Sequence, residues 1–210
     1  MELKPIAFAD DGRLATRELL RRFEALGHAG ELSARLEALD ALDRQYGARA
    51  RLALEDVGEL VASLVVDLSP LGDAELVIGT ALWAIRQGVA IDAPEPVVNA
   101  LAERSNAARS KQELAAVLAI MEAVIDNVRP RLGADLERSN PERPWRILHA
   151  NLAITAIRTE EATLMDSAFD ALDAGLPDER ASFYAEALAL ALAPRISPVV
   201  RERIEARIQA

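Results

Sequence analysis

The amino-acid sequence predicts an all-α protein of about ten helices, packed as stacked antiparallel hairpins and without a β-sheet. Apolar residues recur at intervals of three and four along most of the chain, which is the spacing of an amphipathic helix. Hydrophobic residues make up 51% of the chain, mostly as the strong helix formers Ala and Leu, and only 4% of residues are aromatic. β-Branched residues rarely cluster, although strands favour them.

Two helices are expected in the first part of the chain. Apolar residues at helical spacing predict them over 10–27 and 31–46, and a glycine ends each one. Together they predict an N-terminal helical hairpin at residues 1–47. The remainder, 48–210, is expected to form stacked hairpins that continue from the first hairpin as one domain.

Four helices are expected next, over 55–68, 73–88, 94–108 and 110–130. The second of them is apolar on several faces around Trp83, which predicts that it is buried. The turns between these helices are short, and short turns make consecutive helices antiparallel neighbours.

The helix over 110–130 carries clear signals at both ends. Ser110 and Glu113 have the spacing of a capping box, in which each side chain bonds to a backbone amide near the other. Pro130 is expected to end or kink the helix, because proline lacks the amide hydrogen that the helix interior needs.

The rest of the chain is organised around residues 140–175. Asn140 is expected to be a helix N-cap, with Pro141 as the first helical residue. The helix that follows is apolar on nearly all sides, which predicts that neighbouring helices surround it, with Leu148 and Leu152 inside.

A second helix is expected to follow at once. Thr159 is expected to cap it, Glu160 and Glu161 to open it and Gly175 to end it. These signals predict a tight hairpin whose first arm is buried.

Two final helices are expected over 177–193 and 197–208. From residue 55 onward the helices form pairs of roughly 35–45 residues, the size of helical-hairpin repeats. The pairs span 55–88, 94–132, 140–175 and 177–210. In architecture this resembles HEAT-like stacks, as a right-handed superhelix or a compact bundle. The tetratricopeptide pattern is missing, and no position-by-position repeat is present.

Charge and composition exclude several classes of function. A net charge of −10 disfavours binding to nucleic acid and to anionic membranes. The absence of cysteine removes thiol catalysis and thiolate metal sites. No apolar run reaches the roughly 20 residues that span a bilayer, and the N-terminus lacks an apolar stretch of signal-peptide length. A cytoplasmic protein is therefore expected.

Candidate catalytic groups are few. Most acidic residues fall at expected helix starts, where they stabilise the helix dipole. His28 is expected in a turn, and His149 lies in the most apolar helix without a Ser, Cys or second His at a triad spacing. Neither histidine follows an acidic residue by three positions, as helical carboxylate metal sites require. No glycine-rich phosphate loop is present. No metal or cofactor is therefore expected.

Two polar stripes predict a binding groove. Asn151, Thr155 and Arg158 share one helix face, and Asn99, Glu103 and Asn106 share a face of an earlier helix. Stacked hairpins place equivalent helices side by side and bind partners on the shared concave surface. The hypothesis is that the two stripes, with Arg146 and His149, line a groove for a peptide or protein segment. The competing interpretation is that they are solvated faces.

Three classes of function remain open. The first is a non-catalytic interaction, scaffold or regulatory protein that binds a protein or peptide partner. The second is an enzyme with an unrecognised site near His149. The third is a ligand-responsive helical regulator, although its expected DNA-binding end has only a small basic cluster at Arg17, Arg21 and Arg22. The apolar stripe of the last helix, through Ile204 and Ile208, is also a candidate face for homo-oligomers.

Overall fold

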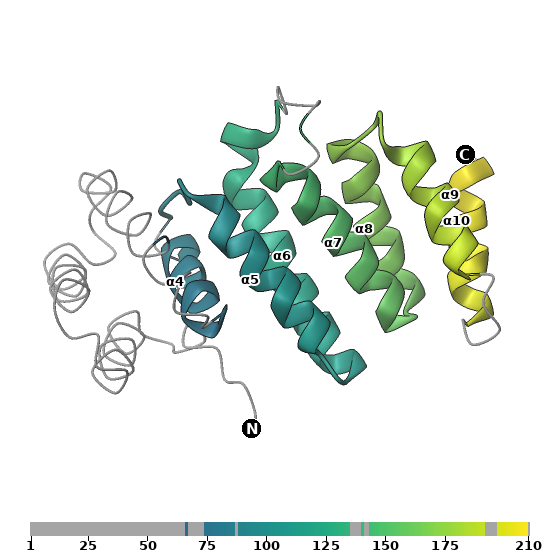
Figure 1. The fold of residues 1–210 in the computed structure, drawn as a ribbon, viewed down its shortest axis with the longest axis horizontal. Helices are drawn as coiled ribbons and strands as arrows, with labels where there is room; N and C mark the ends of the chain where they lie inside the picture. The colour runs from purple at the N-terminus through teal and green to yellow at the C-terminus, as the bar shows by residue number, and fades with distance from the viewer. Residues whose placement is uncertain are drawn as a thin grey trace, which may run out of the picture. The chain divides into compact units, whose positions relative to one another are not determined.

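A computed structural model describes residues 66, 74–86, 88–134, 140, 143–191 and 197–209. This described part contains seven helices and no strand, which confirms an all-α fold (Figure 1). The helices are α4 (Ala74–Arg86), α5 (Pro94–Ala107), α6 (Lys111–Leu132), α7 (Pro144–Thr159), α8 (Ala162–Gly175), α9 (Arg180–Ala191) and α10 (Pro198–Gln209).

Some expectations lie outside the described residues. They are the helices over 10–27 and 31–46, most of the helix over 55–68, the boundary after residue 47 and the turn with His28. Trp83 lies in α4, and its side chain is also outside the described part. Within the described part, no helix has the length and apolar character needed to cross a membrane.

The described residues fall into two compact units. The first comprises those up to Arg104 together with 126–128. Its core includes Val77, Ala84, Val97 and Leu101. A side chain from α6 fixes the loop that precedes α5: Asn127 donates from Nδ2 to the carbonyl of Val89 and accepts from the amide of Ile91, both at 2.9 Å. These bonds satisfy backbone groups that no helix pairs.

The second unit comprises the described residues of 105–125 and 129–210. Within it, α7 packs against α8, and α10 packs against α9 and α8 (Figure 1). Glu160 and Glu161 alone connect α7 to α8, and Glu160 adopts the left-handed conformation at φ 56°. The tight hairpin expected within 140–175 is confirmed.

The first arm of this hairpin is buried on most sides. Leu148 and Leu152 are 1% and 0% exposed, as predicted. Trp145 is also buried, and its Nε1 donates to the carbonyl of Gly175 at 3.0 Å. The expectation of burial on nearly all sides was wrong for one face, because Ile154 is 47% exposed.

The expected ends of this hairpin need two corrections. Helix α7 begins at Pro144 with Arg143 as N-cap, and not at Asn140 and Pro141. The second proline therefore takes the first helical position, which suits a residue with fixed φ and no amide hydrogen. Thr159 is the last residue of α7 and not the N-cap of α8: its hydroxyl donates to the carbonyl of Ala156 at 2.7 Å and accepts from the amide of Glu161 at 3.1 Å. Glu161 is the N-cap of α8.

Helix α6 begins where the sequence predicts and ends two residues after Pro130. The amide of Glu113 donates to the hydroxyl of Ser110 at 3.2 Å, and the Glu113 carboxylate accepts from the amide of Arg109 at 3.0 Å. The capping box is thus present, but the Glu113 side chain accepts from the amide of Arg109, one residue before the N-cap Ser110. Pro130 does not end the helix, which runs on to Leu132.

Candidate functional site

The second unit has an open apolar hollow between α7, α9 and α10, which we call the apolar groove. Its volume is about 270 Å³. It is lined by Ile154, Ile157 and Arg158 of α7, by Phe183, Glu186, Ala187, Leu190 and Ala191 of α9, and by Val200 of α10. Leu190 is 75% exposed, and Ile154 is 47% exposed. Large aliphatic side chains therefore face solvent around a concave surface.

Helix periodicity explains why these side chains meet there. Ile154 and Arg158 stand four apart on α7, and Phe183, Ala187 and Leu190 stand four and three apart on α9. Another side of α9 points into the core through Tyr184, which is 1% exposed. Helix α9 thus has apolar side chains on two faces, of which only one is buried.

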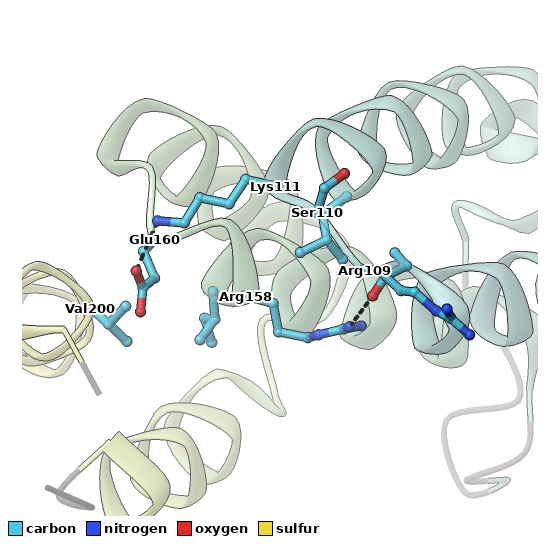
Figure 2. Close-up of a pocket in the computed structure, with 9 residues that line it drawn as sticks. Arg109, Ser110, Lys111, Arg158, Glu160 and Val200 are labelled. Carbon is cyan, nitrogen blue, oxygen red and sulfur yellow. Dashed lines mark hydrogen bonds and ion pairs between the residues drawn. The ribbon is translucent and has the colours of Figure 1, made fainter. Parts of the chain in front are cut away.

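A second hollow, which we call the basic pocket, adjoins the apolar groove. Its volume is about 360 Å³. It is lined by Ala108, Arg109, Ser110, Lys111, Leu114, Ile157, Arg158, Glu160 and Val200 (Figure 2). The two hollows share Ile157, Arg158 and Val200, so they lie next to each other on the second unit.

Arg158 is held between the two hollows by uncharged oxygens at the end of α5. Its Nη1 donates to the carbonyl and hydroxyl oxygens of Ser105, at 2.8 and 3.1 Å, and its Nη2 donates to the carbonyl of Ala108 at 3.4 Å. The last carbonyls of a helix lack partners within the helix and carry partial negative charge, so a guanidinium is favourable there. The side chain is therefore positioned by the fold.

The other charges of the basic pocket come from α6, from the turn before it and from the end of α7. Figure 2 shows Lys111 reaching toward Glu160, with Nζ 2.8 Å from Oε2. Arg109 is exposed just before the helix begins. Among the described residues, three basic side chains and one carboxylate therefore line the pocket, in a chain whose net charge is −10.

The residues predicted for a binding groove have different surroundings. Arg158 lines both hollows, whereas Thr155 is only 1% exposed. The Thr155 hydroxyl lies 2.8 Å from the Ser105 hydroxyl and 3.9 Å from the sulfur of Met121. Thr155 therefore stabilises the interior.

Arg146 and His149 lie near the other end of α7. The guanidinium of Arg146 donates to Glu179 at 2.6 Å, and Arg143 pairs with the same carboxylate. Burial of Glu179 opposes its ionisation, but the hydrogen bonds and charges of the two arginines outweigh this effect and lower its pKa. His149 is 1% exposed and lines neither hollow.

The ring of His149 is closely surrounded. Its centroid lies 4.2 Å from that of Trp145, and its Nδ1 is 2.9 Å from the Trp145 carbonyl. A Cβ at Gly175 would stand 2.4 Å from its Nε2, so only glycine leaves room for the imidazole. A general base needs access to its substrate, and this packing leaves no such access.

The remaining predicted residues are more open. Asn151 is half-buried, and Asn99, Glu103 and Asn106 are exposed. Asn99 and Glu103 belong to the first unit, and the other predicted residues belong to the second. That the two stripes line one groove therefore stays a prediction.

Sequence reasoning missed the groove residues Ile154, Phe183 and Leu190 because apolar side chains at helical spacing were assigned to the core. A usable signal was the excess of apolar residues on α7, whose buried face is already filled by Leu148 and Leu152. An apolar residue beyond that face is a candidate for an exposed patch.

Within the described residues, no group of three or more His, Cys, Asp or Glu side chains is arranged to hold a metal ion. Comparison of the chain with protein-family models, with curated proteins and with solved structures finds no match. The inference of function therefore rests on the geometry of the apolar groove and the basic pocket.

Proposed function

We propose that this chain is a non-catalytic helical interaction protein, of the scaffold or regulatory kind, that binds a segment of a partner protein in the apolar groove. The proposal includes the wider arrangement expected from the sequence, a HEAT-like stack of hairpins. The observation that carries it is the exposure of Leu190 and Ile154, at 75% and 47%, around a hollow of about 270 Å³.

Energetics favour a partner at this surface. Complete burial of a Leu or Ile side chain is worth about 1.5–3 kcal/mol, so two anchors supply a useful part of a binding free energy. The walls are regular helices, and α7 is fixed by its buried face through Leu148 and Leu152. A preformed groove loses little conformational entropy on binding. Helical grooves of this kind accept amphipathic segments.

The enzymatic alternative has less support. It depends on His149, whose ring is buried against Trp145 and Gly175. Arg158, the predicted partner-binding residue that lines both hollows, carries a guanidinium, a group suited to the recognition of carboxylates. The groove offers contact area and a positive charge, which suit recognition better than bond-making.

The test is a quantitative affinity purification from the native cells with three tagged variants beside the wild type. Leu190→Glu places a charge in the groove. Ile208→Glu makes the same kind of change at a 49% exposed site on α10, and Ala189→Glu adds the charge to α9 outside the groove lining. Thermal unfolding verifies that all four proteins are folded.

We expect a defined set of proteins to be lost from Leu190→Glu alone and kept by both controls. If folded Leu190→Glu retains the same proteins in the same amounts as the wild type, the groove does not bind the partner and the proposal is wrong.

A further inference from the structure

We infer that the apolar groove and the basic pocket together accept an amphipathic helix with an acidic C-terminal end. This inference rests on the proposed function and names the chemistry of the partner. The two hollows share Ile157, Arg158 and Val200, so one ligand of modest length reaches both. Its apolar face would lie against Ile154 and Leu190, and its last turn would enter the basic pocket.

The charges give the ligand an orientation. Arg158 lies beside both hollows, and among the described residues its hydrogen bonds go to uncharged oxygens of Ser105 and Ala108, which do not neutralise its charge. Arg109 adds a second exposed positive charge beside the first amides of α6. Glu186, by contrast, lines the apolar groove but not the basic pocket. A ligand with negative charge at one end therefore fits in one direction.

The remaining charges of the pocket do not reverse this preference. Lys111 and Glu160 pair with each other at 2.8 Å, and Glu113 is engaged in capping α6. A helical ligand adds its own asymmetry, because its C-terminus carries partial negative charge. Acidic side chains in its last turn reinforce that end, and Glu186 favours its positive end.

The shape of the surface indicates a peptide helix and not an extended polyanion. The walls of the apolar groove are helices α7 and α9, and helices that dock between helices use apolar residues at i, i+3, i+4 and i+7. Phosphate chains offer no apolar side chains for Ile154, Phe183 and Leu190. The net charge of −10 also repels long anionic polymers, whereas a single acidic turn meets only the local positive charge.

The test measures binding of three fluorescein-labelled synthetic peptides to the full chain by fluorescence anisotropy. The first peptide has leucines at i, i+3, i+4 and i+7 and glutamates in its last turn. The second replaces those glutamates by lysines, and the third replaces the leucines by serines. We expect the first to bind, the second to bind about tenfold more weakly and the third to bind undetectably. We expect the first peptide to bind more weakly at about 0.5 M salt than at low salt, because salt screens exposed charges.

Two protein variants locate the site of binding. Leu190→Glu should abolish binding of the acidic peptide, and Arg109→Glu should weaken it about fivefold, because its exposed side chain meets the acidic turn. The matched control is Arg131→Glu, which makes the same charge reversal about 30 Å away along α6. Arg131→Glu should bind like the wild type.

Equal binding of the acidic and lysine peptides overturns the inference, and so does wild-type binding by Arg109→Glu. If Leu190→Glu nevertheless abolishes binding of the acidic peptide, the proposed function stands. Failure of all three peptides also overturns it, and the affinity purification then decides the proposed function alone. If sedimentation shows a concentration-dependent dimer that Leu190→Glu dissociates, the occupant is a second copy of the chain and the inference is wrong.

Discussion

Thr155 and Ser105 share a hydrogen bond of 2.8 Å between their hydroxyl groups, although they stand 50 positions apart. Both side chains are buried, at 1% and 4% exposure. Arg158 donates to the same Ser105 hydroxyl from the next turn of α7. These contacts join the last turns of α7 to the end of α5, and they explain why Thr155 and Arg158 interrupt an otherwise apolar helix.

Replacement of Thr155 by Val should lower the free energy of unfolding by about 1–2 kcal/mol, because the shape is kept while a buried hydroxyl loses a partner. Urea denaturation followed by circular dichroism measures this. The control is the double variant Thr155→Val with Ser105→Ala, which should cost less than the sum of the two single changes. Additive costs would mean that the two hydroxyls do not interact.

Gly175 makes room for the His149 ring, and Gly175→Ala should therefore be strongly destabilising. The added Cβ would lie 2.4 Å from Nε2, so the ring or the backbone must move, at a cost of about 2 kcal/mol or more. Thermal unfolding measures the loss. Adding His149→Ala should remove the clash, so the double variant should be more stable than additivity predicts. Strict additivity would show that the imidazole is not the obstacle.

Arg207 should secure α10 to α8. Its Nη1 lies 2.7 Å from Asp170 and 3.2 Å from Asp173, and its guanidinium lies 5.8 Å from the centroid of Phe169. Arg207→Met keeps the aliphatic stem and removes the charge, so α10 should open more often, at a local cost of about 1–2 kcal/mol. Hydrogen exchange of residues 198–209 measures the opening.

The matched control for this prediction is Arg203→Met on the same helix. Arg203 pairs with Asp166 at 3.2 Å, and both side chains are well exposed at 44% and 39%. Exposed pairs contribute about 0–1 kcal/mol, so exchange should change little. Equal acceleration in the two variants would contradict the special role of Arg207.

Glu179 should make the protein sensitive to acid. Its pKa in the folded protein is lowered by Arg146 and Arg143 below the ordinary value of about 4.3, despite the opposing effect of burial. The stabilisation is therefore complete above that ordinary pKa and is lost as the pH falls through the lower folded-state pKa. Glu179→Gln should reduce stability at neutral pH by about 1–3 kcal/mol and flatten its decline in acid.

Urea unfolding between neutral pH and about pH 3 measures this dependence, a range that spans the ordinary pKa of glutamate. The control is Glu186→Gln, which changes an exposed carboxylate on α9, the helix that begins directly after Glu179. An unchanged acid profile for Glu179→Gln would show that the pairing with Arg146 and Arg143 carries no linkage to folding.

Much of the fold could be predicted from the sequence, because the signals that start, end and bury a helix are local. The capping box of Ser110 and Glu113 and the burial of Leu148 and Leu152 all follow from spacing within one or two turns, and the structure has each of them. Helix ends were harder to predict, because residues suited to start or cap a helix stand within a few positions of one another. Helix α7 begins at Pro144 and not at Pro141. The Thr159 hydroxyl bonds both backward to the carbonyl of Ala156 and forward to the amide of Glu161, but Glu161 is the N-cap of α8.

The candidate site could be predicted only in part from the sequence. Arg158 was predicted to bind a partner from its place on a polar stripe; its side chain lines both hollows, and its role in binding stays a prediction. Thr155 on the same stripe is buried, because Ser105, 50 positions earlier, supplies its partner. No pattern within α7 distinguishes these two outcomes.

The sequence by itself determined that this chain is helical, where most of its described helices lie and which leucines of α7 are buried, because each of these depends on residues within a few turns of one another. Only the tertiary structure decided which apolar side chains stay outside. Ile154 and Leu190 have the same chemistry as core residues, and they are exposed because no neighbouring helix among the described residues covers their side of α7 and α9. Burial depends on which elements pack together, and the residues that decide that packing are far away in the sequence.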